Sequence, residues 1–103
     1  MLLSFLQRMF YRCESLEEAP ELPATTLAEH CYDDMFSYCK SLITPPRLPA
    51  LKLAVGCYWS MFYDCKSLNS APELPATNLA EDCYKYMFSG CESLTAAPAL
   101  PAT

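Results

Sequence analysis

A repeat of 26 residues runs through the chain and constrains its fold more than any other feature. The dipeptide Met-Phe recurs at 9–10, 35–36, 61–62 and 87–88, always 26 residues apart. Four units, 5–30, 31–56, 57–82 and 83–103, align without a gap. A period of about 20–50 residues is typical of stacked repeats, in which one unit alone buries too little surface to fold. We therefore predict a single repeat domain over residues 1–103.

The first part of each unit has the spacing of a short helix. On one face of an α-helix, positions i, i+4, i+5 and i+8 lie together. In the second unit this is the spacing of Cys31, Met35, Phe36 and Cys39. The residues between them are expected to face solvent; these are Asp33, Asp34, Ser37 and Tyr38.

The second part of each unit is rich in proline. Eight of the nine prolines fall in two columns: Pro20, Pro46, Pro72 and Pro98, then Pro23, Pro49, Pro75 and Pro101. Proline fixes φ and favours extended backbone before it. We predict a short strand centred on 68–71 of the third unit, then an extended segment through Leu74. Two buried ladders should result: Leu16, Leu42, Leu68 and Leu94, and Leu22, Leu48, Leu74 and Leu100.

The predicted fold class is therefore an α/β repeat solenoid of leucine-rich-repeat type, with a short helix and a short parallel strand in each of four units. No polar capping unit is evident at either end. Residues 1–4 occupy the last four positions of a preceding unit, and Thr103 stops five positions short of completing the fourth. We expect a segment of a longer array, or a chain whose ends pair, including end-to-end self-association.

Charge and hydropathy exclude several classes of partner. The net charge of −5 and the pI near 4.6 disfavour nucleic-acid binding, which needs a basic surface. No apolar run approaches the roughly 18 residues that a membrane-spanning helix needs, so direct membrane insertion is not expected. The start, "MLLSFLQRMF", lacks the basic region of a signal peptide. With two glycines, the chain has no glycine-rich phosphate loop.

The order Met-Phe-x-x-Cys-x-Ser-Leu, followed by Leu-Pro, resembles the BspA-like leucine-rich repeats of bacterial surface proteins. In the second unit Phe36, Cys39, Leu42 and the pair Leu48-Pro49 carry the match. The unit is longer than is usual in that family, and the prolines of the Pro46 column interrupt the strand. The resemblance implies a curved solenoid with a parallel sheet on one face. It also implies surface display, with adhesion or recognition of a host component.

The seven cysteines form two columns, Cys31, Cys57 and Cys83, and Cys13, Cys39, Cys65 and Cys91. We favour buried thiols that act as small apolar side chains. Stacking at sheet-like spacing would also allow a disulfide between neighbours in a column, although the odd number and parallel side-chain directions disfavour it. Zinc is disfavoured because Cys-x-x-Cys is absent and His30 is the only histidine. His30 and Cys31 adjoin, and adjacent helical residues do not face each other, so no Cys–His catalysis and no cofactor are predicted.

Two sets of residues are candidates for binding. Glu21, Arg47 and Glu73 share a column with Ala99 beside the predicted strand, and would form either a recognition strip or a solvated polar face. Trp59 and Tyr63 occupy variable positions of the predicted helix. They could anchor a partner or a sugar, or simply pack between units.

The sequence thus favours a non-enzymatic protein- or glycan-recognition and adhesion module of a bacterial surface protein. Its location, at the cell surface or secreted, follows from the resemblance alone. The alternative is a structural spacer with no ligand of its own. A third class, a cysteine-based metal or redox enzyme, is disfavoured by the cysteine spacing.

Overall fold

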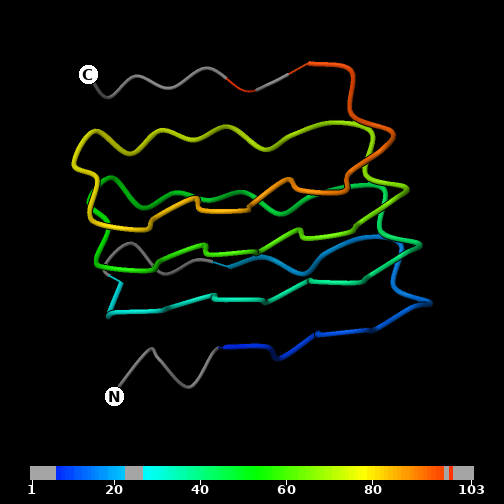
Figure 1. Cartoon of the computed structure of the whole chain (residues 1–103), viewed down its shortest axis with the longest axis horizontal. Helices are drawn as coiled ribbons and strands as arrows, with labels where there is room; N and C mark the ends of the chain where they lie inside the picture. The colour runs from blue at the N-terminus through cyan, green and yellow to red at the C-terminus, as the bar shows by residue number, and fades with distance from the viewer. Residues whose placement is uncertain (1–6, 23–26, 97, 99–103) are drawn as a thin grey trace.

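Successive repeat units lie on one another as coils of the chain (Figure 1). The computed structural model describes residues 7–22, 27–96 and 98. We name the units coil 1 (5–30), coil 2 (31–56), coil 3 (57–82) and coil 4 (83–103). Equivalent rings stack almost in parallel: centroids are 5.4 Å apart for Phe10–Phe36 and 5.8 Å apart for Phe36–Phe62. The extents of 30 × 30 × 20 Å and radius of gyration of 12.3 Å indicate a compact body.

The predicted short helices are wrong, because the described residues form no helix. Their places are taken by runs of tight turns at 7–12, 29–38, 55–64 and 81–90, which we call the turn face. Within a coil, N–H groups bond three residues back, as from Met35 to the Tyr32 carbonyl (3.2 Å). The next residue, Phe36, donates instead to Met61 of the following coil (2.9 Å). An α-helix would need bonds four residues back along the same segment.

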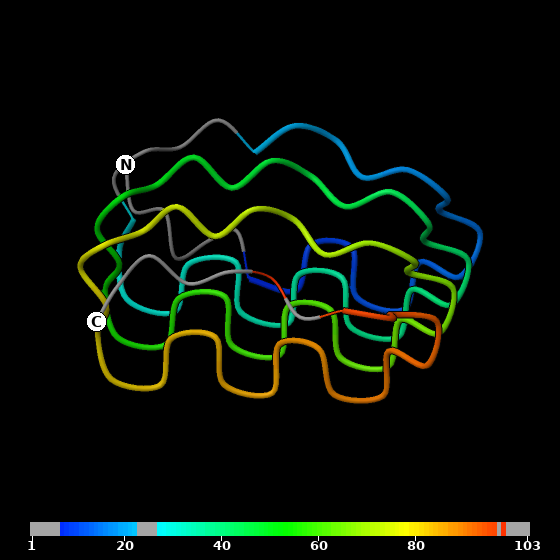
Figure 2. The ribbon, with the colours of Figure 1, turned by 90° about the horizontal axis from the view of Figure 1, so that it is seen from above.

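Alternating backbone conformation explains this pattern. In the run of turns at 29–38, φ is positive at His30 (58°), Tyr32 (65°), Asp34 (53°) and Tyr38 (62°). A positive φ at the third residue of a turn is the signature of type II turns. The chain therefore runs as a square wave, visible from above in Figure 2. It turns residues inward in pairs: 31–32, then 35–36.

A square wave with a period of four residues produces the same i, i+4, i+5, i+8 spacing as one face of a helix. That coincidence is why the helix prediction failed. One side-chain prediction failed with it, since Ser37 was expected to face solvent and is buried. Its single O–H is shared between two acceptors, the Asp34 carboxylate (2.9 Å) and the Ser60 carbonyl (2.5 Å).

The predicted strands are also wrong. In the described part of the chain, the strand signal is limited to two isolated parallel bridges, Glu18↔Thr44 and Lys52↔Asn78. Between these positions run extended segments, 19–22, 45–50 and 71–76, which we call the proline face. Proline has no N–H, and Pro46 and Pro72 hold the same position in neighbouring coils. Those positions cannot donate to a sheet ladder, so the α/β solenoid of leucine-rich-repeat type is incorrect.

The core lies between the two faces and is built from the repeated columns. Leu42 and Leu68 are fully buried, and Leu22, Leu48 and Leu74 are almost fully buried. The two predicted leucine ladders are therefore confirmed at these five positions. Leu16 and Leu94 are half-buried, and Leu100 lies outside the described residues. Burial is also confirmed for the thiols of the central coils, Cys31, Cys39, Cys57 and Cys65, while Cys13, Cys83 and Cys91 are half-buried.

Candidate functional site

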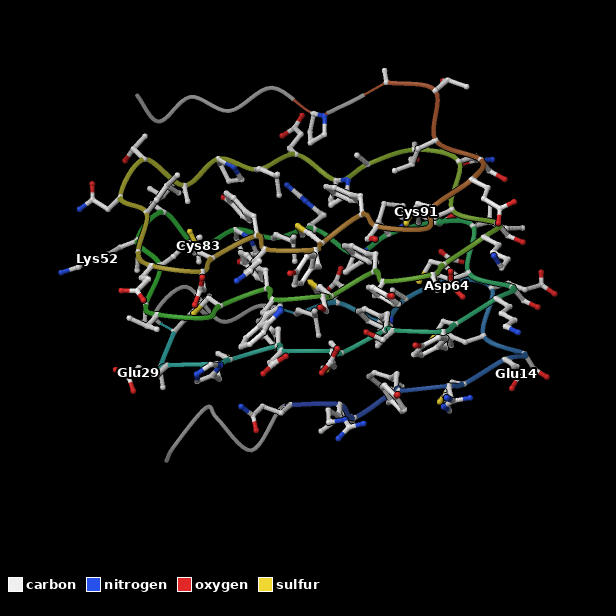
Figure 3. All side chains as sticks on the ribbon, in the orientation of Figure 1. Glu14, Glu29, Lys52, Asp64, Cys83 and Cys91 are labelled. Atoms are coloured by element: carbon white, nitrogen blue, oxygen red, sulfur yellow. The ribbon has the colours of Figure 1, made fainter. Side chains whose placement is uncertain are left out.

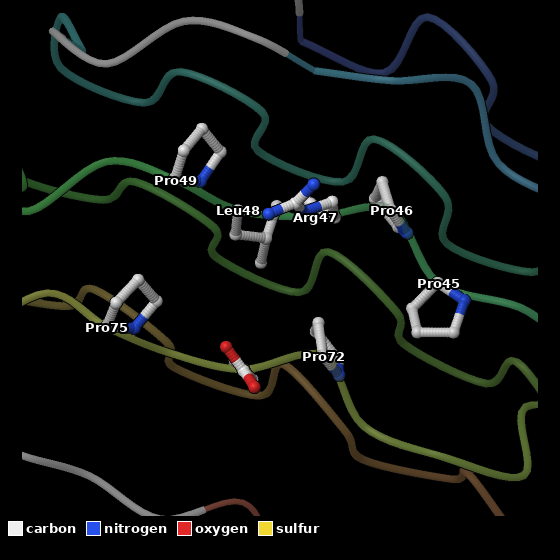
Figure 4. Close-up of a pocket in the computed structure, with 8 residues that line it drawn as sticks. Pro45, Pro46, Arg47, Leu48, Pro49, Pro72 and Pro75 are labelled. Atoms are coloured by element: carbon white, nitrogen blue, oxygen red, sulfur yellow. The ribbon is translucent and has the colours of Figure 1, made fainter.

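A groove of about 380 Å³ opens on the proline face between coils 2 and 3 (Figure 4). Its walls come from two extended segments that are equivalent in the repeat. Coil 2 contributes Pro45, Pro46, Arg47, Leu48 and Pro49, and coil 3 contributes Pro72, Glu73 and Pro75. Two charged side chains therefore stand among proline rings and one leucine.

Local sequence explains why these charges point outward. An extended chain turns successive side chains to opposite sides. Pro46 and Leu48 are buried, so Arg47 between them is exposed. Glu73 is exposed in the same way, between the buried Pro72 and Leu74. Because proline fixes φ, the backbone that carries both charges has little freedom.

Neither charge is neutralised by another side chain among the described residues. Arg47 and Glu73 form no ion pair or hydrogen bond in the part of the chain that the structure describes. They occupy the same repeat position in adjacent coils. The groove thus offers a cation and an anion side by side, both available to a ligand.

The other candidates lie elsewhere. Glu21 is exposed on coil 1 in the same column but does not line the groove. Ala99 falls outside the described residues. Trp59 and Tyr63 belong to the turn face. That face lies on the opposite side of the molecule from the proline face (Figure 2). The predicted binding residues are therefore split between two surfaces, and only Arg47 and Glu73 are brought together.

On the turn face, Trp59 and Tyr63 are half-buried and contact side chains of other coils. The Trp59 ring lies 5.8 Å from the His30 ring and 6.0 Å from the Lys85 ammonium. Tyr63 meets the edge of Tyr38, with centroids 5.5 Å apart. These contacts favour packing between units over an open anchor.

The sequence indicated exposed aromatic side chains such as Tyr38 on this part of the chain, but the arginines that lie on them were missed. Tyr11 meets Tyr38 edge-on at 5.6 Å. The Arg8 guanidinium lies 4.2 Å from the Tyr11 ring centre, and that of Arg12 lies 4.5 Å from the Tyr38 ring centre. The available signal was a tyrosine at position 7 or 8 of three consecutive units, with Arg8 and Arg12 close to that tyrosine in the first unit. Such contacts stabilise exposed surfaces by roughly 0.5–1 kcal/mol each.

The buried thiols have low reactivity because burial keeps them protonated. Cys39 donates its S–H to the Phe10 carbonyl (3.0 Å), and Cys65 does the same to Phe36 (3.0 Å). Burial raises the pKa of Cys39 to about 11 and that of Cys65 further. A thiol that stays protonated is a poor nucleophile and a poor metal ligand. Across residues 7–22, 27–96 and 98, no three His, Cys, Asp or Glu side chains gather where they could hold a metal ion.

His30 pairs with a carboxylate and not with its neighbouring thiol. Its Nδ1 lies 3.4 Å from Oδ2 of Asp33. Burial, and next the charge of Asp34, raise the pKa of Asp33 to about 6, while His30 opposes the shift. Cys31 is completely buried in the core, whereas His30 is partly exposed on the turn face. This geometry provides no thiol–imidazole pair for nucleophilic catalysis.

Comparisons of the chain with protein-family models, curated proteins and solved structures returned no match. Within the described residues, no helix is long and apolar enough to cross a membrane.

Proposed function

We propose that this chain is a non-enzymatic recognition module that binds a protein or glycan ligand in the groove between coils 2 and 3. The observation that carries the proposal is the juxtaposition of Arg47 and Glu73: two opposite charges, with no ion pair among the described residues, held side by side on proline-stiffened backbone. Its location at a bacterial cell surface, or in secreted form, is part of the proposal and rests on the sequence resemblance.

Preorganisation supports a binding role for this groove. Ordering a flexible loop at an interface costs about 0.5–1.5 kcal/mol per immobilised side chain, and a rigid segment avoids part of that cost. Proline rings and Leu48 provide apolar contact for a ligand, while the two opposite charges fix the orientation in which it binds. The mixed charge favours an extended peptide segment that presents one acidic and one basic side chain over a neutral glycan.

The test is direct binding of the purified chain to an immobilised panel of extracellular-matrix proteins and glycans. Arg47→Glu and Glu73→Arg should each weaken saturable binding by about tenfold, equivalent to about 1.4 kcal/mol. Glu21→Arg is the matched control, because it reverses a charge in the same column outside the groove. It should change affinity less than about twofold.

Absence of binding across the panel would overturn the proposal and favour the structural spacer. Equal losses from Glu21→Arg and Arg47→Glu would instead indicate a diffuse charge effect, and would remove the groove as the site.

A further inference from the structure

The ends of the stack are complementary, and this begins with the backbone. On the turn face, alternate N–H groups donate to the following coil: Phe62 to Met87 (3.0 Å) and Asp64 to Ser89 (2.7 Å). The equivalent donors of coil 4 are Tyr86, Phe88 and Gly90. These three N–H groups donate to no residue of the described chain. Within the described residues, coil 4 therefore presents a row of backbone donors that have no acceptor.

Coil 1 presents the matching acceptors. The carbonyls of Asp33, Met35 and Ser37 in coil 2 accept N–H groups from coil 1, at 2.9, 3.1 and 2.9 Å. The equivalent carbonyls of coil 1 belong to Gln7, Met9 and Tyr11. They accept no backbone hydrogen bond from the described residues. These N–H groups of coil 4 and carbonyls of coil 1 hold the same repeat positions as the pairs that are already made inside the molecule.

The apolar rows end in the same complementary way. A hollow of about 360 Å³ opens on coil 4 beside Phe88, Cys91 and Leu94. The equivalent residues of coil 3, Phe62, Cys65 and Leu68, are each 0% exposed. They differ because coil 4 covers coil 3, whereas no described coil covers coil 4. Figure 3 labels Cys91 on coil 4 and Glu14 on coil 1, at opposite ends of the stack.

Coil 1 carries the surface that would fill this hollow. Phe10, Cys13 and Leu16 are half-buried at the repeat positions of Phe88, Cys91 and Leu94. Met9 is 53% exposed, while its counterparts Met35, Met61 and Met87 are at most 2% exposed. Inside the chain, Cys91 donates its S–H to the Phe62 carbonyl of the preceding coil (3.0 Å). Cys13 has the same thiol, with no preceding coil among the described residues.

We propose that copies of this chain associate head to tail, with coil 4 of one copy covered by coil 1 of the next. In this contact the N–H groups of Tyr86, Phe88 and Gly90 meet the carbonyls of Gln7, Met9 and Tyr11. The thiol of Cys13 meets the Phe88 carbonyl, and the Phe10 ring extends the phenylalanine stack. The second copy is the fitting occupant because the contact continues the coil-to-coil interface that the chain already makes three times.

The symmetry of the assembly follows from the two different surfaces. A heterologous contact leaves one free end of each kind, so it continues into an open linear assembly unless the rotation closes a ring. One like-charge contact would weaken this association, because Glu92 of one copy would lie beside Glu14 of the next. Within the chain the same position pairs Lys66 with Glu92 at 2.5 Å.

The test uses sedimentation velocity over a concentration series of the full 103-residue chain. Met9→Glu places a charge on the coil 1 end, and Thr95→Glu/Ala96→Glu places two charges in the hollow of coil 4. All three positions are exposed, so folding should be preserved, and urea unfolding of each variant verifies this. The unmodified chain should gain mass with concentration. Each variant alone should stay monomeric, and an equimolar mixture should form a 1:1 dimer and nothing larger.

Three further variants sharpen the result. Glu14→Lys should tighten association by about two- to fivefold, since it replaces a like-charge contact with the Lys66–Glu92 type of pair. Leu51→Glu, at an apolar residue 59% exposed away from the ends, should leave association unchanged. Arg47→Glu should also leave it unchanged, so that failure of groove binding and failure of association are told apart.

A chain that stays monomeric up to its solubility limit would overturn the proposal. Dimers formed by either end variant alone would also overturn it, because they would indicate a contact between two like ends. Loss of association in Leu51→Glu would overturn it as well, because it would indicate a lateral contact.

Discussion

The two faces of the molecule hold the same coils together by different means. On the turn face, alternate N–H groups cross from one coil to the next, as from Tyr38 to Tyr63 at 2.8 Å. On the described part of the proline face, hydrogen bonds between coils occur only near the bridges, such as Leu53 to Asn78 at 2.9 Å. Between those positions the buried Leu48 and Leu74 hold the extended segments to the core. Stacked repeats therefore need neither a helix nor a sheet, provided one face supplies the hydrogen bonds.

The largest expected effect comes from placing proline on each face. Ser60 has a φ of 52° and donates its N–H to Lys85 of coil 4 (2.8 Å). Ser60→Pro removes that donor and reverses φ, which should destabilise the fold by about 5 kcal/mol. Ala71→Pro on the proline face should stay within about 1 kcal/mol of the unmodified chain. Its N–H makes no backbone bond in the described chain, and coil 2 already has Pro45 at that position.

Urea unfolding followed by the fluorescence of Trp59, the single tryptophan, measures both variants. Ser60→Gly is the control that keeps the N–H and accepts a positive φ, so it should be close to neutral. Equal destabilisation by Ser60→Pro and Ala71→Pro would contradict the conclusion that the turn face supplies most of the hydrogen bonds between coils.

The next effect compares buried side chains from the two faces. Phe62 is 0% exposed and stacks between Phe36 and Phe88, at 5.8 Å from each. Phe62→Ala should destabilise the chain by about 4 kcal/mol, since it removes the ring's burial and two stacking contacts. Leu74→Ala, from the proline face, should remove about 3 kcal/mol. The midpoint and slope of urea unfolding give both values, and a larger loss for Leu74→Ala would reverse the comparison.

Part of this architecture could be predicted from the sequence. The repeat and its apolar columns were sufficient to identify buried positions such as Cys39, Phe36, Leu42 and Leu48. Burial depends on which residue types recur, and both a helix and a square wave place the same columns inside. The backbone conformation could not be recovered from that spacing. Gly56 and Gly90 were the missed signal, because glycine favours positive φ and weakens a helix interior.

For the candidate site, the sequence predicted only which residues share a repeat position, and not which surface they form. The repeat placed Arg47 and Glu73 at equivalent positions, and stacking then made them neighbours. Whether Trp59 belonged to the same surface depended on where the chain reverses between its two faces. That reversal depends on turns such as 40–41 and 66–67, which the helix-and-strand prediction did not include.

A smaller effect on stability depends on pH and comes from one carboxyl group of the turn face. Asp33, on the turn face, has a pKa raised to about 6 by burial and by Asp34, against about 3.9 in an unfolded chain. The folded state therefore binds more protons between these values, and stability falls as pH rises from about 4 to about 6. Thermal unfolding midpoints should decline over this window by a few degrees more in the unmodified chain than in Asp33→Asn. Parallel declines in both proteins would show that Asp33 is not responsible.

The smallest effect tests the backbone of the turn face alone. Asp82 is the last residue of coil 3 and has a φ of 61°, at the repeat position where coil 2 has Gly56. Its side chain makes an exposed ion pair with Lys85 at 3.7 Å, which contributes little. Asp82→Gly should stabilise the chain by about 0.5 kcal/mol, because relief of the left-handed conformation outweighs the added freedom of the unfolded chain. Glu81→Gly next to it, where φ is not positive, should destabilise by about the same amount. If both glycines destabilise equally, the positive φ at Asp82 carries no strain, and the turn face owes its order to stacking alone.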